Sequence, residues 1–411
     1  MRSHKIILFF VFCAMQVRAQ TEISNGQKTY DFINYAANNL HMPDDAKMPS
    51  FYTKLAHLVA IGDKQINIVH IGDSHIQADF FSNRMRSLFQ NYFIGGNGGR
   101  GFVFPYTIAR TNNPSNYKVK YTGSWQACRN IEINKTCTLG LAGMIVTTSD
   151  SEASFKLSSA TFDNIIYDYT RIRIFYNSEE DSHNIELENI GTVQVEEVNE
   201  SPSVKEWILS GATNEVDIRI KRLVPGNTIF TLYGIALETE DPGIIYHAVG
   251  VNGAQVTSFL RCELFEEQLQ KLDPDLIIIS LGTNDAYGNP FDENVFKANY
   301  LTLLNRIKKA NPGAPILLTT PGDCYKSKVP NKNNLKARET IYELANEQQC
   351  NVWDFFTVMG GLGSMQTWKN NGLAAADRVH HTKAGYELQG NLMFDALIKG
   401  FENYIGARGQ R

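Results

Sequence analysis

The segment that decides the fold is QINIVHIGDS, at residues 65–74. Its first seven residues, Gln65 to Ile71, form a short apolar run, which predicts a buried strand of a parallel β-sheet. The glycine of Gly72-Asp73-Ser74 permits a tight turn after that strand. Gln77 to Tyr92 then predicts a helix, so this part of the chain follows the strand-turn-helix order of α/β proteins.

The same alternation occurs on both sides of this segment. We expect further buried strands at Ile244–Val249, Leu276–Leu281, Pro315–Thr320 and Asn351–Asp354. We expect helices at Thr29–Leu40, Pro49–Ile61, Val256–Leu272, Asn294–Ala310, Asn333–Gln348 and Lys383–Lys399. Strands that alternate with helices predict a parallel sheet covered by helices on both faces.

Residues 111–242 have a different pattern. Short stretches of alternating apolar and polar residues recur there, separated by Gly, Asn, Ser and Pro, at Tyr117–Tyr121, Arg171–Tyr176, Thr192–Glu197 and Glu215–Lys221. This pattern predicts an all-β unit, most simply a sandwich. A chain of 411 residues is long enough for two units. We therefore expect one α/β domain, made of residues 20–110 and 243–411, that is interrupted by a β-sandwich of residues 111–242.

The first 19 residues resemble a signal peptide. A basic start at residues 2–5 precedes the apolar run Ile6–Met15, which is too short to span a bilayer. Val17-Arg18-Ala19 offers small residues where a signal peptidase reads, so we expect cleavage after Ala19 and an exported, periplasmic or extracellular protein. A buried helix and a lipid anchor at Cys13 are the alternatives. No later stretch is apolar enough to predict a membrane segment.

Charge and cysteine content exclude some functions. The formal net charge is −4 and no long run has one sign, so the sequence lacks the concentrated basic surface of a nucleic-acid-binding protein. After cleavage five cysteines would remain, of which Cys128 and Cys137 could close a short disulfide loop in an exporting compartment. No Cys or His spacing resembles a zinc site, and we expect neither a metal nor a cofactor.

Three short motifs follow predicted strands or precede a helix, where sites form in doubly wound sheets. Ser74 follows the first strand, and Asn284 of Gly282-Thr283-Asn284-Asp285 follows the strand at Leu276–Leu281. Asp377 and His380 lie three residues apart before the last helix, so the carboxylate can orient the imidazole, which can then accept a proton from a hydroxyl. Singly, these residues have ordinary structural readings as helix caps, turn residues or an ion pair.

A fourth motif, Gly250-Val251-Asn252-Gly253, follows the strand at Ile244–Val249. A glycine there can bring its backbone N–H close to a substrate oxygen, and it can equally be a turn glycine. Gly250 and the glycine-rich loop Gly95–Gly101 compete with Gly253 for this role. His381 competes with His380 as the base, although it lacks the three-residue spacing from Asp377.

Together, in this chain order, the four motifs resemble the sequence blocks of SGNH/GDSL hydrolases. The resemblance covers the α/β part of the chain and implies a flavodoxin-like parallel sheet. It also implies that Ser74 is the nucleophile, that His380 is the general base and that Asp377 orients His380. The oxyanion hole would consist of the Ser74 N–H, the Gly253 N–H and the Asn284 side chain.

A closer resemblance comes from the extended block GDSHIQAD at residues 72–79, the β unit between the first and second blocks, and the residues Met359-Gly360-Gly361, Ser364-Met365 and Trp368. These features are similar to those of bacterial peptidoglycan O-acetylesterases, in which the inserted β-domain resembles a carbohydrate-binding module. The resemblance implies a serine esterase that removes acetyl groups from a glycan, most simply peptidoglycan.

Several alternatives stay open at this stage. The acetyl group could pass to a glycan instead of water, the substrate could be another acetylated polysaccharide, or the protein could bind glycans without catalysis. The β unit could bind sugars through ring faces, for which Trp125, Tyr121, Tyr167 and Tyr169 are candidates, although packing in the sandwich core is the commoner role of such residues.

Overall fold

A computed structural model describes residues 28–409, except residues 94, 164, 180–181, 191–194, 202 and 289. The expected signal peptide at residues 1–19 lies outside the described residues. Within the described ranges, every helix is too short or too polar to cross a membrane.

The α/β part is built on a six-stranded sheet with the order β1-β19-β16-β15-β2-β14. All neighbours from β19 to β14 are parallel, and the short β1 pairs antiparallel at the edge. The five parallel strands follow the order 2-1-3-4-5 of flavodoxin-like folds, which confirms the expected architecture. The strand bounds are Leu40–His41 (β1), Gln65–Gly72 (β2), Gly243–Gly250 (β14), Leu276–Ser280 (β15), Ile316–Thr319 (β16) and Asn351–Trp353 (β19).

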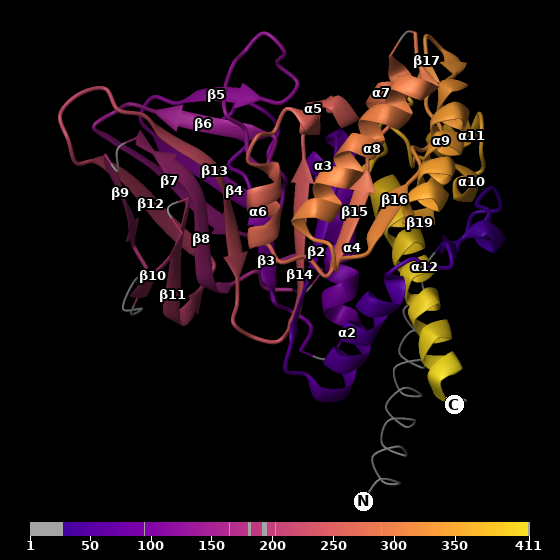
Figure 1. The fold of residues 1–411 in the computed structure, drawn as a ribbon, viewed down its shortest axis with the longest axis horizontal. Coiled ribbons are helices and arrows are strands. Elements are labelled where there is room, and N and C mark those ends of the chain that lie inside the picture. The colour runs from indigo at the N-terminus through magenta and orange to yellow at the C-terminus, as the bar shows by residue number, and fades with distance from the viewer. Residues whose placement is uncertain are drawn as a thin grey trace, which may run out of the picture.

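Helices cover both faces of this sheet (Figure 1). Side chains of β2 alternate, so that Val69 and Ile71 join the core under α5, α6, α8 and α9, whereas Ile66 and Ile68 join the core under α2, α4 and α12. The helices are α2 (Met48–Ile61), α3 (Ser74–Gln77), α4 (Phe80–Tyr92), α5 (Val256–Leu260), α6 (Phe265–Lys271), α7 (Thr283–Tyr287), α8 (Glu293–Ala310), α9 (Asn333–Gln348), α10 (Phe355–Val358), α11 (Ser364–Asn370) and α12 (Lys383–Gly409).

The β unit consists of two antiparallel sheets beside the α/β part (Figure 1). One sheet has the order β10-β11-β8-β13-β6-β5, with β3 paired to β13, and the other has the order β4-β7-β12-β9. The strands are β3 (Gly99–Val103), β4 (Tyr117–Thr122), β5 (Gln126–Arg129), β6 (Met144–Thr148), β7 (Glu152–Ser159), β8 (Tyr169–Ser178), β9 (His183–Glu188), β10 (Val195–Ser201), β11 (Val204–Thr213), β12 (Glu215–Arg222) and β13 (Phe230–Glu238). Because β3 belongs to this unit, its antiparallel sheets begin before residue 111, where the sequence predicted the start of the β unit.

The expected helix at Thr29–Leu40 is wrong. Only Tyr35–Ala37 forms a short 3₁₀ helix, η1. Asparagine side chains on both sides of η1 explain the difference. Asn34 caps its start by accepting from the Ala37 N–H at 3.2 Å, and Asn38 after its end donates to the distant Leu392 carbonyl at 2.8 Å.

Two other expected helices are each divided. Asp79 has a left-handed backbone (φ 53°), which ends α3 and redirects the chain into α4. The segment Val256–Leu272 breaks between α5 and α6, where the Leu264 N–H donates to the Leu139 carbonyl of the β unit at 3.0 Å. A small hairpin of β17 (Tyr325–Lys326) and β18 (Val329–Pro330) lies outside the expected elements.

The five cysteines after residue 20 divide into one disulfide and three free thiols. Cys128 and Cys137 are joined, as the sequence allowed. Cys262, Cys324 and Cys350 are free and buried.

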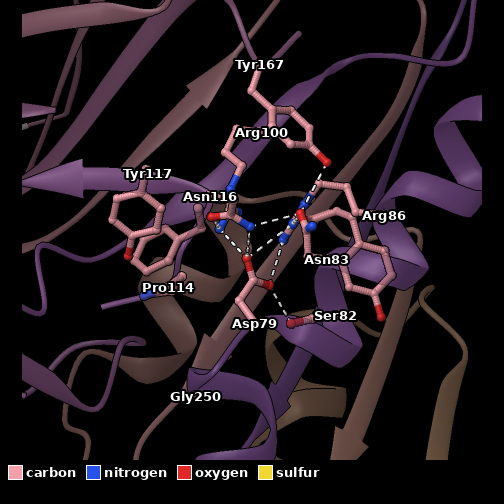
Figure 2. Close-up of polar contacts among 12 residues, drawn as sticks. Asp79, Ser82, Asn83, Arg86, Arg100, Pro114, Asn116, Tyr117, Tyr167 and Gly250 are labelled. Carbon is pink, nitrogen blue, oxygen red and sulfur yellow. Dashed lines mark hydrogen bonds and ion pairs between the residues drawn. The ribbon is translucent and has the colours of Figure 1, made fainter. Parts of the chain in front are cut away.

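A buried ionic cluster joins α4 to the β unit (Figure 2). Asp79 contacts Arg86 of α4 at 3.2 Å and Arg100 of β3 at 2.5 Å, and all three side chains are at most 2% exposed. Asn116 of the segment before β4 also donates to Asp79, at 2.7 Å. Burial acts to raise the pKa of Asp79, but the two guanidinium groups outweigh it and hold this pKa below its ordinary value.

Asp79→Asn removes the carboxylate and leaves two buried guanidinium groups without their counter-charge. We expect the free energy of unfolding to fall by about 3–5 kcal/mol, measured by urea denaturation. Lys336→Ala is the control, because the pair of Lys336 with Glu293 is exposed and such pairs contribute little. Equal effects of the two substitutions would contradict the importance of the buried cluster.

Candidate active site

Ser74, His380 and Asp377 form a continuous hydrogen-bonded chain. Ser74 is the first residue of α3, directly after β2. Its Oγ lies 2.9 Å from His380 Nε2, and His380 Nδ1 lies 2.7 Å from Asp377 Oδ2. A proton on Nδ1 that is donated to the carboxylate leaves the Nε2 lone pair facing the serine hydroxyl.

Asp377 is also held by the backbone that follows it. Its Oδ1 accepts from the N–H groups of Val379, at 2.9 Å, and His380, at 3.0 Å. Partial burial acts to raise the pKa of Asp377, but the His380 ring and these two N–H groups outweigh it and lower this pKa. The three-residue spacing therefore gives one turn of chain that fixes both the carboxylate and the imidazole.

Asn284 of α7 connects the regions of Ser74 and Gly253. Its Nδ2 donates to Asp73 Oδ2 at 3.2 Å, next to Ser74, and to the Ala254 carbonyl at 3.0 Å, next to Gly253. All five residues expected in the site thus lie around the ends of β2, β14 and β15. Both hydrogens of the Asn284 amide are engaged in this state, so donation to a substrate requires one of them to be shared or released.

The competing glycines have other surroundings. A Cβ at Gly250 would lie 2.2 Å from the Gln77 N, so Gly250 allows close packing of α3 on β14. Gly253 has a φ of 78°, and a Cβ there would lie 4.0 Å from the nearest atom, Ile131 Cδ1, so no close approach of a neighbour requires a glycine at this position. The Gly95–Gly101 loop contacts Ile244 at the amino end of β14, which is the opposite end of the sheet.

His381 lies behind the site and not in contact with Ser74. Its ring packs 4.9 Å from Trp368 and 5.3 Å from Tyr386, and it is buried. Burial, together with the neighbouring imidazoles of His75 and His380, lowers the pKa of His381 to about 3. His381 is therefore a packed, neutral ring, whereas the adjacent His380 contacts Ser74 and Asp377.

Several polar residues of the site were not identified from the sequence. His75, whose Nδ1 lies 2.9 Å from the Tyr386 hydroxyl, packs 5.4 Å from the His380 ring. Asp73 accepts from the His75 N–H at 3.0 Å. Gln77 is buried against the loop that carries Gly253. The position of His75, Asp73 and Gln77 within the GDSHIQAD block could have indicated that they lie near the site, but it did not indicate which residues they contact.

Buried carboxyl groups surround these elements. Burial raises the pKa of Asp73 to about 7 and that of Asp285 to about 7. Asp285 accepts from the Val256 N–H, at 3.2 and 3.3 Å, at the start of α5. In the part of the chain that the structure describes, no three His, Cys, Asp or Glu side chains are placed to hold a metal ion.

Asp285→Asn removes one of these titrating groups while keeping an acceptor for Val256. Because the folded pKa of Asp285 is raised, the folded chain binds a proton that the unfolded chain has released between about pH 4 and pH 7. Stability due to this group therefore falls as pH rises through that window. We expect the melting temperature of the variant, relative to that of the wild-type chain, to rise from pH 4 to pH 7. A constant difference across this range would contradict a raised pKa of Asp285.

Known proteins resemble this chain in part of its sequence and in its fold. Residues 233–388 match the GDSL-like lipase/acylhydrolase family. Among curated proteins there is no match. A solved structure of a peptidoglycan O-acetylesterase is similar over 89% of this chain and 99% of its own, with 24% identity and a TM-score of 0.72, and it therefore shares the fold, including the β unit.

Two other solved structures are similar only in part. An acetyl xylan esterase covers 37% of this chain and 80% of its own, with 20% identity and a TM-score of 0.31. A carbohydrate esterase family 3 protein from Talaromyces cellulolyticus covers 40% and 73%, with 19% identity and a TM-score of 0.31. The matched family segment contains Gly253, Asn284, Asp377 and His380. This segment, from β13 to α12, is the part of the chain that is similar to the GDSL-like lipase/acylhydrolase family.

Proposed function

We propose that this chain is an exported serine esterase that removes O-acetyl groups from a glycan, and that this glycan is peptidoglycan. The observation that carries the proposal is the continuous chain from Ser74 Oγ through His380 to Asp377, with distances of 2.9 and 2.7 Å. A hydroxyl, a base and an orienting carboxylate in this order are the arrangement needed for nucleophilic catalysis.

The reaction would proceed through an acyl-enzyme. Ser74 Oγ attacks the acetyl carbon while His380 Nε2 takes the hydroxyl proton, and Asp377 stabilises the imidazolium that forms. His380 then protonates the sugar oxygen as the ester C–O bond breaks, which leaves the acetyl group on Ser74. In the second half, His380 takes a proton from water, which attacks the acetyl carbon, and then returns it to Ser74 as acetate leaves.

The oxyanion of each tetrahedral intermediate would be stabilised by three donors. The Ser74 N–H lies in the first turn of α3, where it has no partner within the helix. The Gly253 N–H and the Asn284 amide complete the set, and Asn284 would exchange its 3.2 Å bond to Asp73 for one to the oxyanion. Burial of Asp73 raises its pKa to about 7, so a protonated Asp73 would hold the Asn284 amide less strongly.

The choice of substrate rests on the fold and on the sequence. A solved structure that shares the fold over both units is that of a peptidoglycan O-acetylesterase. A signal peptide at residues 1–19 would place this chain where peptidoglycan is found. The β unit, residues 111–242 as expected from the sequence, would then lie beside the end of the sheet where the polymer would bind.

Sugar stacking on the β unit has little support from the four aromatic candidates. Trp125, Tyr167 and Tyr169 are at most 8% exposed and pack in the protein interior, whereas Tyr121 is 42% exposed. The commoner structural role therefore applies to three of them. Tyr121 on β4 is the one of these four whose ring face could meet a sugar.

Ser74→Ala tests the proposed nucleophile. We expect acetate release from a chromogenic acetate ester to fall by at least about 10⁴-fold, because the variant has no attacking oxygen. Ser115→Ala is the matched control, since Ser115 is exposed and lies outside the site. Full activity of Ser74→Ala would reject the assignment, and an inactive wild-type chain would favour a glycan-binding protein.

A substrate panel tests the proposed glycan. We expect kcat/KM for acetate release from O-acetylated peptidoglycan to exceed that for acetylated xylan by at least about tenfold. The reverse preference would assign the enzyme to another polysaccharide. Transfer of acetyl groups to an added chito-oligosaccharide, in place of acetate release, would identify a transferase.

A further inference from the structure

We propose that the β unit helps to form the oxyanion hole through a positioning residue, Asn112, which acts on the Gly253 loop together with Gln77 of α3, and so contributes to the acyl chemistry itself. This inference rests on the proposed esterase function. It differs from a role of the β unit in holding the polymer, because it applies equally to a small ester that cannot reach the two antiparallel sheets.

Gln77, the last residue of α3, uses both ends of its side-chain amide. Its Oε1 accepts from the Asn252 backbone N–H at 2.7 Å. Its Nε2 donates to Thr111 Oγ1 at 3.0 Å and to the carbonyl and side-chain oxygens of Asn112, both at 3.1 Å. Gln77 is 1% exposed, so each of these groups would be costly to leave without a partner.

Asn112 receives a second bond from the loop after β14. The Asn252 side-chain amide donates to Asn112 Oδ1 and, at 3.3 Å, to Thr111 Oγ1. Thr111 and Asn112 lie between β3 and β4, the first two strands of the β unit. Three segments far apart in the sequence therefore meet at one point: the nucleophile helix, the loop that carries Gly253 and the β unit.

Hydrogen bonds on both sides of Gly253 help to set its position in the loop. The residue is exposed, and a side chain there would find no atom closer than 4.0 Å. Its two neighbours each make a hydrogen bond. The Asn252 N–H donates to the Gln77 side chain, and the Ala254 carbonyl accepts from Asn284 Nδ2. The network of Gln77, Asn112 and Asn252 therefore sets the direction in which the Gly253 N–H points.

Two substitutions at Asn112 can separate a hydrogen-bonding role from a role in shape alone. Asn112 is exposed and therefore tolerant of change. The side chain of Asn112 acts in this network through its Oδ1 as an acceptor. Asn112→Asp keeps that acceptor, whereas Asn112→Leu has a similar shape without it. A role in shape alone would not separate the two variants.

We expect Asn112→Leu to lower kcat on a small acetate ester by about tenfold or more, with little change in KM, because small misplacements of a catalytic group cost up to about 10²-fold. Asn112→Asp should remain near wild-type activity. Lys118→Ala on β4, an exposed residue outside the network, is the matched control. Unchanged kcat in Asn112→Leu, or equal losses in the Leu and Asp variants, would overturn the proposal.

Hydrogen–deuterium exchange provides a readout that does not depend on activity. We expect faster exchange of the backbone amides in residues 250–255 of Asn112→Leu, and wild-type exchange in Asn112→Asp. Unaltered exchange in the Leu variant would reject the positioning role even if the chain is an esterase. An inactive wild-type chain with the expected exchange pattern would instead reject the proposed function and keep the structural coupling.

Discussion

Three parallel strands that end in register determine where the candidate site residues can lie. Gly72 at the end of β2 pairs with Gly250 of β14 on one side and with Ser280 of β15 on the other. Ser74, Gly253 and Asn284 follow these ends by two, three and four residues, so they meet at one edge of the sheet. This edge, between the first and third strands of a flavodoxin-like order, is the switch point at which such sheets bind ligands.

Glycines at the strand ends permit this convergence. A Cβ at Gly72 would lie 2.4 Å from the Ile76 side chain and 2.9 Å from the Ser280 carbonyl, and a Cβ at Gly250 would meet α3. Their absence of side chains lets α3 start directly on the sheet. The next residues of the same block then bind the β unit, Gln77 through neutral hydrogen bonds and Asp79 through Arg100 of β3. Helix α3, which carries Ser74, is therefore fixed by the sheet below it and by the β unit beside it.

The sequence was sufficient to predict the parts of the fold that local patterns determine. Short apolar runs predicted β2 and β15. Because strand ends converge in any parallel sheet, these strands also predicted that Ser74 and Asn284, which follow them, lie at the same edge. The three-residue spacing predicted the contact of Asp377 with His380. Thr29–Leu40 was misassigned because its asparagines bond to groups as distant in sequence as Leu392. The contacts of Gln77 and Asn112 could not be predicted, since their partner Asn252 lies 175 and 140 residues away along the chain.

The most direct test of the central claim is to identify the residue that reacts with a fluorophosphonate, by peptide mass spectrometry of the labelled wild-type chain. A serine that is activated by the His380–Asp377 pair reacts with such a probe, whereas an ordinary exposed serine does not. We predict a single label on Ser74 that is lost in His380→Ala and retained in His381→Ala. Labelling of another residue, or labelling of Ser74 that persists without His380, would contradict the account.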